Sequence, residues 1–319
     1  MRSLASLNPR NAAMAIEVLA GLRASPRVLS PKYFYDERGS LLFEQITGLP
    51  EYYPTRTEIG IMQANIEEIV ERAGRQASLI EFGSGSSTKT RILLDHLQEL
   101  AAYVPVDISR DFLLTTVEQL AHDFPHIEML PVFADFTRAF ELPRPRLMPL
   151  KNIVYFPGST IGNFAPARAL DLLRVMAAAA KRGGGLLIGV DLKKDARVLE
   201  AAYNDSAGIT AKFNLNMLKR LNEDLQANFD LGNFRHEALY NEAESRIEMH
   251  LVSRIDQRFT VAGETFSMAR GESIRTECSY KFNMSEFAAL AAAAGFVTDA
   301  VWTDDQQLFS VQYLSCVGP

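Results

Sequence analysis

Residues 78–88 read Ser-Leu-Ile-Glu-Phe-Gly-Ser-Gly-Ser-Ser-Thr, an apolar run that passes directly into a loop containing Gly83 and Gly85. The run predicts a buried strand at 78–83, and the apolar periodicity that follows predicts a helix at 88–100. A strand, a Gly-x-Gly turn and a helix in this order place backbone N–H groups and a helix N-terminus at one spot. The missing side chains let a nucleotide-like ligand approach closely. This stretch therefore predicts the first strand-helix unit of a nucleotide-binding sheet.

The same alternation continues along the chain. Further strands are predicted at 101–106, 126–132, 151–156 and 186–190, with helices at 109–123 and 166–181. A helix at 285–294 and a closing strand pair at 296–302 and 308–316, joined by a turn at Asp304-Asp305, resume the pattern after an interruption. Strands that alternate with helices this regularly indicate a parallel sheet with helices on both faces.

The interruption is an insertion of about 85 residues with a different pattern. One or two long helices are predicted at 194–226, and several strands with alternating polarity at 233–277. We expect the N-terminal segment to pack with the insertion, its first sixteen residues (with Arg2 and Arg10) beginning an amphipathic helix. The chain is therefore expected to form two non-contiguous domains, 57–193 plus 281–319 and 1–56 plus 194–280.

Composition excludes several classes of protein. The 319 residues are 47% hydrophobic and 23% charged, which is typical of a soluble globular protein rather than a disordered, collagenous or disulfide-scaffold chain. A net charge of −6 without a dense Lys/Arg run argues against a nucleic-acid partner. No stretch approaches 18 apolar residues, and no apolar signal region precedes the helix, so neither a membrane span nor secretion is expected.

Cysteine and histidine usage bears on the cellular compartment and on metal binding. Cys278 and Cys316 lack CxxC spacing, and the five histidines fall in no ligand pattern. We therefore expect a cytoplasmic protein without a metal ion.

Acidic and aromatic residues follow two more of the predicted strands. Asp107 ends the second strand, where it is placed to accept hydrogen bonds from both hydroxyls of a ribose. Asp135 and Phe136 follow the third strand, where they could contact the edge of an adenine and cover its face. Asp107 could instead be a helix cap, and Phe136 simply a core residue. Features at three successive strand ends, where such sheets bind ligands, favour a binding site.

The loop discriminates between cofactors. A dinucleotide fingerprint requires G-x-G-x-x-G, but Thr88 stands where the third glycine should be, and no phosphate-binding lysine motif is present. Glu81-x-Gly83-x-Gly85 is similar to the loop of S-adenosylmethionine-dependent methyltransferases, although Ser87 replaces a third glycine common in that motif. The closing strand pair is also similar to the antiparallel end of that fold. A methyltransferase is favoured over a dehydrogenase.

Longer strings make the resemblance more specific. They are Pro-Lys-Tyr-Phe-Tyr-Asp (31–36), Gly-Ser-Leu-Leu-Phe-Glu (39–44), Glu-Tyr-Tyr-Pro-Thr-Arg-Thr-Glu (51–58), Glu-Phe-Gly-Ser-Gly-Ser-Ser-Thr-Lys-Thr (81–90), Phe-Pro-Gly-Ser-Thr-Ile-Gly-Asn-Phe (156–164) and Ile-Arg-Thr-Glu-Cys-Ser (274–279). Together they closely resemble the bacterial histidine Nα-methyltransferases of ergothioneine biosynthesis, over almost the whole length.

The resemblance implies a fold and a reaction. The fold class would be α/β, a Rossmann-like class I methyltransferase sheet with an inserted α+β substrate-binding domain. Domain 57–193 plus 281–319 would bind S-adenosylmethionine, and domain 1–56 plus 194–280 the substrate. The reaction would move three methyl groups from S-adenosylmethionine to the α-amino nitrogen of L-histidine, giving hercynine, in an enzyme expected to be monomeric.

The resemblance also implies roles for individual residues. The substrate carboxylate and amine would be held by Tyr53, Asn163 and Tyr203, and the imidazole by Glu277 and Ser279. Tyr35 and Asn163 would lie at the reacting amine, and Met249 would line the ring pocket. The cofactor would be bound by Gly83, Ser84, Gly85, Lys89, Asp107, Asp135 and Phe136.

Five of the six substrate-binding residues also have an ordinary structural alternative. Glu277 and Ser279 alternate onto one face of a strand, where they could grip an imidazole or simply be solvated. Tyr52-Tyr53-Pro54 could be a packed aromatic turn, Asn163 a turn residue and Tyr203 a core residue.

Three other functions stay open. Another aromatic amino acid or a histidine derivative could be the substrate, although Glu277 and Ser279 argue against an indole or a phenol. A nicotinamide-dependent oxidoreductase is disfavoured by Thr88. A catalytically inactive binding module would require a lost cofactor site, which the sequence does not show.

Overall fold

The computed structural model describes residues 9–85, 87–97 and 99–318 and divides the chain into two compact units. The four-stranded unit combines Met1–Tyr53 with Lys194–Ser279. The seven-stranded unit combines Pro54–Lys193 with Tyr280–Pro319. The expected helix start at residues 1–8 lies outside the described residues.

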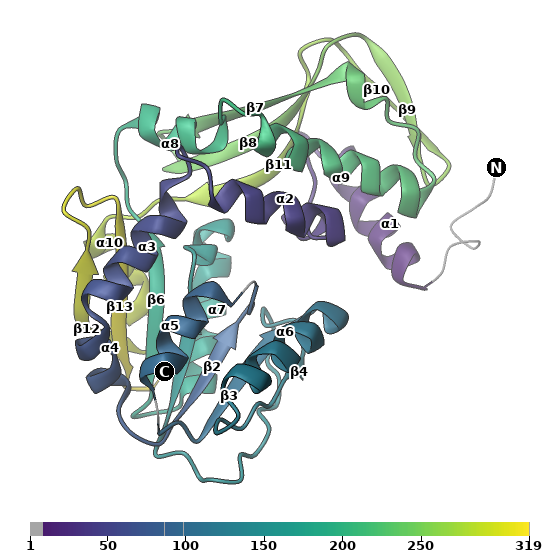
Figure 1. The fold of residues 1–319 in the computed structure, drawn as a ribbon. Helices are drawn as coiled ribbons and strands as arrows, with labels where there is room; N and C mark the ends of the chain where they lie inside the picture. Colours follow the sequence, from purple (N-terminus) through teal and green to yellow (C-terminus); the bar gives the residue numbers. More distant parts are fainter. Residues whose placement is uncertain (1–8, 86, 98, 319) are drawn as a thin grey trace. The chain divides into compact units, whose positions relative to one another are not determined.

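The seven-stranded unit is built on one mixed sheet (Figure 1). Its strands, in spatial order, are β12 (Phe296–Thr303), β13 (Phe309–Cys316), β6 (Gly185–Asp191), β5 (Lys151–Phe156), β2 (Ala77–Phe82), β3 (Ala102–Asp107) and β4 (Val132–Phe133). Strands β6, β5, β2, β3 and β4 pair in parallel, whereas β13 is antiparallel to both of its neighbours. The predicted Rossmann-like sheet with an antiparallel closing pair is therefore confirmed.

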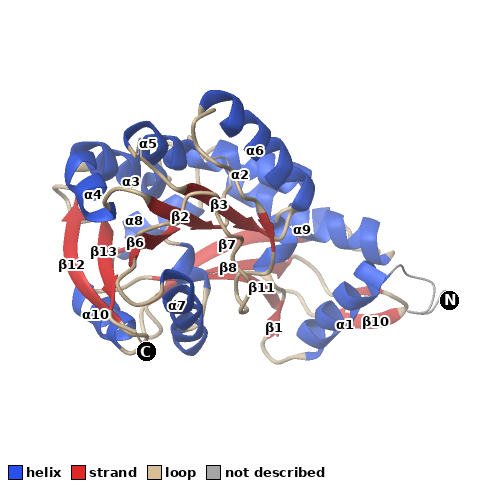
Figure 2. Cartoon of the chain, turned by 90° about the horizontal axis from the view of Figure 1, so that it is seen from below, coloured by secondary structure: helices blue, strands red, loops and turns tan. Residues whose placement is uncertain are grey.

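Helices cover both faces of this sheet. They are α3 (Tyr53–Ala64), α4 (Ile66–Ala73), α5 (Thr88–His96), α6 (Arg110–Asp123), α7 (Pro166–Ala180) and α10 (Met284–Ala292), with a 3-10 turn η3 at Thr160–Asn163. The neighbouring helices α4 and α5 lie on one side of the sheet, and α7 and α10 on the other (Figure 2). Every residue of β2 is buried, as expected for a parallel strand covered on both faces.

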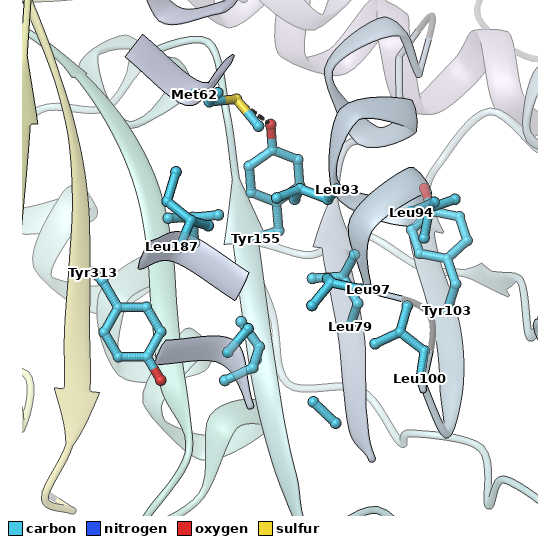
Figure 3. Close-up of a cluster of buried hydrophobic side chains, with 14 of the residues drawn as sticks. Met62, Leu79, Leu93, Leu94, Leu97, Leu100, Tyr103, Tyr155, Leu187 and Tyr313 are labelled. Carbon is cyan, nitrogen blue, oxygen red and sulfur yellow. Dashed lines mark hydrogen bonds between the residues drawn. The ribbon is translucent and has the colours of Figure 1, made fainter. Parts of the chain in front are cut away.

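One hydrophobic core of the unit lies between the sheet and the helices α3, α4, α5 and α6. Leu79 of β2, Tyr155 of β5 and Leu187 of β6 meet Leu93 of α5 there (Figure 3). The Tyr155 hydroxyl donates to the sulfur of Met62 on α3 at 3.4 Å. This packing fixes where the strands end, and therefore where the loops after them lie.

The strand predicted at 126–132 is wrong for most of its length. Only β4 pairs regularly with β3, while the segment before it makes two isolated bonds, from Tyr103 N–H to the Glu128 carbonyl and from Leu130 N–H to the Tyr103 carbonyl, both 2.9 Å. Pro131 comes next and has no N–H to donate, so the ladder is interrupted at that residue.

The four-stranded unit contains a second sheet and a hairpin. The sheet has the order β1 (Arg27–Val28), β11 (Ser273–Tyr280), β8 (Arg246–Ser253) and β7 (Phe234–Asn241), and the hairpin pairs β9 (Gln257–Val261) with β10 (Glu264–Met268). Its helices are α1 (Pro9–Arg23), α2 (Glu37–Thr47), α8 (Ala196–Tyr203) and α9 (Ile209–Leu225), with 3-10 turns η2 (Pro31–Phe34) and η4 (Leu231–Asn233). The parallel pairing of β1 with β11 joins the N-terminal segment to the inserted residues.

The inserted helical region is two helices rather than one. Asp205 lies between α8 and α9, and its carboxylate accepts the N–H groups of Ile209 at 2.8 Å and Thr210 at 2.7 Å. These bonds satisfy donors that the first turn of α9 leaves without a helical partner, so the second helix begins there. Among the helices of the described ranges, none is long and apolar enough to cross a membrane.

Candidate functional site

The glycine loop after β2 adopts a backbone that glycine favours. Gly83 has φ +78° and Gly85 has φ +45°, both in the left-handed region. The Gly83 N–H donates to the Val106 carbonyl at 2.8 Å, which ties the turn to β3. A Cβ atom added to Gly85 would meet nothing within 4 Å, so the space beside this glycine is open. Ser86 lies outside the described residues.

Two buried hydroxyls beside this loop have no hydrogen-bond partner among the described residues. The Oγ atoms of Ser84 and Ser87 are buried, and within the described part of the chain neither makes a hydrogen bond. Buried polar atoms are nearly always paired in folded proteins. The loop therefore offers two hydroxyls that a polar ligand group could engage.

Asp107 stands at the carboxyl end of β3, as predicted. Burial raises the pKa of its carboxyl, while backbone N–H groups, including that of Ser109 at 2.8 Å, oppose the rise. Asp107 thus supports the start of α6, where Ser109 is the cap residue without a side-chain cap bond of its own. The helix-cap alternative therefore holds in part.

Sequence reasoning did not find an apolar surface that lies beside Asp107. Ile108 is 71% exposed and Phe133, at the end of β4, is 43% exposed. Arg110 covers Phe133, with its guanidinium carbon 5.0 Å from the ring centroid. The available signal was a large apolar residue directly after the acidic end of a strand. An exposed apolar pair beside a carboxylate suits a flat ring carried on a ribose.

Asp135 and Phe136 both have partners within the protein. Asp135 is exposed and accepts the Thr137 N–H at 3.0 Å and the Thr137 hydroxyl at 2.6 Å. The Phe136 ring is half-buried and packs on Phe82 and Phe156, with centroid distances of 5.7 and 5.9 Å. The core alternative therefore applies to part of the Phe136 ring.

Glu81, the acidic residue of the loop pattern, faces the core. It is 1% exposed and accepts the Thr90 hydroxyl at 2.8 and 2.9 Å and the Tyr103 hydroxyl. Burial raises the pKa of its carboxyl to about 8, although both hydrogen bonds oppose the rise. Glu81 therefore links β2 to α5 and β3 and does not face a ligand.

In the seven-stranded unit, Glu58 contacts both Lys89 and the loop that leads to Asn163. The Lys89 Nζ lies 2.5 Å from the Glu58 carboxylate, which also accepts the Gly158 N–H at 3.0 Å. Gly158 opens the loop that reaches Asn163 at the end of η3, where the side chain is half-buried. The turn alternative for Asn163 holds for its backbone, since the next N–H, of Phe164, closes the turn on Ile161.

In the four-stranded unit, four predicted substrate residues come together. The buried Tyr203 hydroxyl donates to the buried Ser279 hydroxyl at 3.0 Å, so α8 and β11 are joined by a polar contact. The pKa of Tyr35 is raised by burial of its hydroxyl and further by the nearby Glu277 and Tyr203, although 45% of the residue's surface is exposed. Exposure of the ring and burial of the hydroxyl are compatible, because the hydroxyl faces this cluster.

Aromatic rings surround the same cluster. Tyr35 contacts Phe43 and Phe213 edge-on at 5.9 Å, and Tyr52 contacts Phe43 at 6.3 Å and Tyr203 at 6.2 Å. The packed aromatic turn considered from the sequence therefore describes Tyr52. The faces of such rings also tolerate a methylated cation.

Tyr53 has a cationic neighbour that sequence reasoning did not find. The Lys194 ammonium donates to the Tyr53 hydroxyl at 2.6 Å and lies 4.5 Å from the ring centroid. The two residues are 141 positions apart, so no local pattern could join them.

Met249 and Glu277 show the limits of a simple strand pattern. Met249 is 1% exposed, and its carbonyl accepts the Thr276 hydroxyl at 3.2 Å. Along β11 burial alternates as far as Thr276, but Glu277 and Cys278 are both half-buried and Ser279 is buried. Glu277 is therefore not on a fully solvated face. Within the described ranges, no three His, Cys, Asp or Glu residues form a group suited to a metal ion.

Comparison with known proteins gives a consistent result. A family model described as a histidine-specific, S-adenosylmethionine-dependent methyltransferase matches residues 14–316. The histidine N-alpha-methyltransferase of Mycolicibacterium smegmatis is 42% identical over 298 residues, 92% of this chain and 91% of that protein. The protein of the same name from Mycobacterium tuberculosis is 41% identical over 299 residues, 92% of each chain. Ergothioneine biosynthesis protein 1 of Neurospora crassa is 31% identical over 87% of this chain, which spans 32% of that longer protein.

Proposed function

Because this chain belongs to the histidine-specific, S-adenosylmethionine-dependent methyltransferases, we propose that it transfers three methyl groups to the α-amino nitrogen of L-histidine, giving hercynine. The observation that carries the proposal is the family match over residues 14–316. The name of the Neurospora relative supports a place in ergothioneine biosynthesis.

The seven-stranded unit is the proposed binding unit for the methyl donor. S-adenosylmethionine supplies an electrophilic methyl group on a sulfonium. The residues present fit this group, since open space lies beside Gly85, the buried Ser84 hydroxyl has no hydrogen-bond partner among the described residues, and Asp107 is a partly dehydrated carboxylate. Gly83 and Gly85 would let the backbone approach the ligand, and Asp107 would accept from the ribose hydroxyls.

Four further residues complete the proposed donor site. Asp135 and Phe136 would contact the adenine edge and face, and exposed Ile108 would cover the ring from the end of β3. The Lys89 ammonium would pair with the only carboxylate of the donor. A charge-assisted pair of this kind is stronger than a neutral hydrogen bond.

The four-stranded unit is the proposed binding unit for histidine. The Glu277 carboxylate would accept the N–H of the imidazole. The Ser279 hydroxyl, which accepts from Tyr203, would bond the second ring nitrogen. Buried polar groups reject ligands that cannot pair with them, which would disfavour indole and phenol side chains. Met249 would line the ring pocket from β8.

In the four-stranded unit, Tyr53 and Tyr203 would hold the amino-acid end of histidine. Asn163, in the seven-stranded unit, is proposed as a substrate residue from the family resemblance alone. The Lys194 ammonium beside Tyr53 adds positive potential, which suits the substrate carboxylate. The raised pKa of Tyr35 keeps its phenol protonated at neutral pH, so Tyr35 would position the amine rather than remove its proton as a phenolate.

The reaction needs a neutral amine aligned with the methyl carbon, so the main task of the protein is positioning. A peptide α-amino group titrates near 8, and an appreciable neutral fraction therefore exists near physiological pH. Protons would pass to water or to a weak acceptor such as the Asn163 carbonyl. Methylation stops when the nitrogen is quaternary and has no lone pair. The aromatic rings of Tyr35 and Tyr52 would tolerate the growing cation.

We also propose that the enzyme acts in the cytoplasm as a monomer on a small molecule, without a metal ion or a nucleic-acid partner. The net charge of −6 and the two unspaced cysteines support this view. Activity unchanged by EDTA and a sedimentation mass near 35.5 kDa are the expected results.

A substrate panel tests the proposed function. S-adenosylhomocysteine release is measured with equal concentrations of L-histidine, L-tryptophan and L-tyrosine. We expect kcat/KM for histidine to exceed that for the other two by at least about 100-fold, as buried polar recognition allows. Equal values for tryptophan or tyrosine would contradict histidine as the substrate and favour another aromatic amino acid.

A further inference from the structure

Glu58 is a buried carboxylate outside the proposed donor-binding and substrate-binding residues. It lies on α3 and is 1% exposed. Its Oε2 atom is 2.5 Å from the Nζ of Lys89 on α5, and both of its oxygens accept the Gly158 N–H at 3.0 Å. One side chain thus joins α3, the second residue of α5 and the loop after β5.

Two glycines make room for this arrangement. A Cβ atom at position 189, on β6, would lie 2.2 Å from the Glu58 Oε1 atom. A Cβ atom at position 158 would lie 3.3 Å from the Lys89 Nζ. The first distance leaves no space for a methyl group beside Glu58, and the second would require the Lys89 ammonium to shift by a few tenths of an ångström. Glycine at positions 158, directly after β5, and 189, on β6, therefore leaves room for the Glu58–Lys89 pair.

Stability alone does not explain a buried ion pair. Removing both charges from water costs several kcal/mol, and apolar replacements of buried pairs are often neutral or stabilising. Lys89 keeps 18% of its side chain exposed, whereas Glu58 keeps only 1%, so the lysine is the member of the pair that is not fully enclosed by protein. A lysine ammonium sits on a flexible four-carbon stem, and a fixed carboxylate reduces the positions that it samples.

We propose that Glu58 is a positioning residue for the methyl donor: it holds the Lys89 ammonium at the glycine loop, directed at the α-carboxylate of S-adenosylmethionine. Glu58 takes one of the three N–H donors of Lys89 and leaves the others to the ligand. Its bonds to the Gly158 N–H also fix the start of the loop that carries Asn163. The same carboxylate therefore orients Lys89, which binds the methyl donor, and the loop of Asn163, a proposed residue for histidine. This inference rests on the proposed function and adds a residue to it.

A double-mutant cycle in binding tests the inference. The affinities of Glu58→Ala, Lys89→Ala and the double variant are measured by calorimetry for two ligands. S-adenosylhomocysteine carries the α-carboxylate, whereas 5′-methylthioadenosine has the adenosine and sulfur without the amino-acid part. We expect Glu58→Ala to lower the affinity for S-adenosylhomocysteine at least about 10-fold and to change the affinity for 5′-methylthioadenosine by no more than about 2-fold. In the Lys89→Ala background, Glu58→Ala should have no further effect.

Two further variants keep the test decisive. Glu58→Gln retains an oxygen for Lys89 and Gly158 but removes the charge, and we expect an intermediate loss, also confined to S-adenosylhomocysteine. It is measured in the same way if Glu58→Ala does not fold. Glu67→Ala removes an exposed carboxylate from the next helix and should change neither affinity.

Three results would overturn the inference. They are equal weakening of both ligands, tighter binding of S-adenosylhomocysteine by Glu58→Ala, and additive effects of the two single substitutions. These measurements do not depend on histidine. A wild-type protein that binds S-adenosylhomocysteine but makes no methylated histidine would contradict the proposed function and leave this test intact.

Discussion

The buried carboxyl of Glu81 should make the stability of the seven-stranded unit fall as pH rises. Its pKa is raised from 4.5 to about 8 in the folded protein, because burial removes the group from water. The unfolded chain loses this proton near pH 4.5, while the folded chain keeps it up to about pH 8. The stabilisation is therefore complete below pH 4.5 and is lost progressively as pH approaches 8.

The size of the effect follows from the two pKa values. Each unit of difference corresponds to about 1.36 kcal/mol, which gives a loss of about 3.5 kcal/mol between pH 5 and pH 8. Glu81→Gln imitates the protonated acid, with an oxygen for the hydroxyls of Thr90 and Tyr103. The difference in free energy of unfolding, wild type minus variant, should therefore fall by about 3.5 kcal/mol over this range.

Urea unfolding at several pH values measures this difference. The only tryptophan, Trp302, lies on β12 and is 7% exposed, so its fluorescence reports on the seven-stranded unit. Glu118→Gln, an exposed position on α6, is the matched control and should follow the wild type. Parallel pH profiles for wild type and Glu81→Gln would refute the reasoning, because the raised pKa would then not belong to this carboxyl.

Three substitutions test the proposed binding residues. Glu277→Ala should lower kcat/KM for histidine at least about 100-fold and relax selection toward other aromatic amino acids, whereas unchanged histidine kinetics would refute the pocket assignment. Asp107→Ala should weaken S-adenosylhomocysteine binding about 10- to 100-fold in calorimetry, because hydrogen bonds to a charged group contribute about 1.5–3 kcal/mol; an unchanged affinity would leave Asp107 with only its contact to α6. Tyr203→Phe removes the hydroxyl that donates to Ser279 and should raise KM for histidine about 10-fold, while a loss confined to thermal stability would show a structural role.

Local patterns predicted the sheet well. The apolar run at β2 and the glycines after it are neighbours in sequence, so one stretch determines a strand, a turn and the helix that follows. Asp304 similarly closes the last hairpin-like turn, since its carboxylate accepts the N–H groups of Gln306, Leu308 and Phe309. The strand before Pro131 was mispredicted because its apolar pattern is real but one residue cannot donate to the ladder.

Contacts between distant residues could not be predicted in the same way. Tyr203 and Ser279 are 76 positions apart, and Glu58 and Lys89 are 31 apart. Glu58, Lys89 and Ser279 lie within the quoted family strings and Tyr203 does not, but in every case the partner depends on how separate helices and strands pack. Glu58 carried no pattern of its own, since a glutamate at that position of a helix usually faces water. Its burial against Gly189 is a property of the folded sheet.

The most direct test of the account is tandem mass spectrometry of L-histidine after incubation with the protein and S-adenosylmethionine carrying a labelled methyl group. The account predicts a final product with three labelled methyl groups, all on the α-amino nitrogen. Methyl groups on the imidazole ring, or no methylated histidine from a protein that binds S-adenosylhomocysteine, would contradict it.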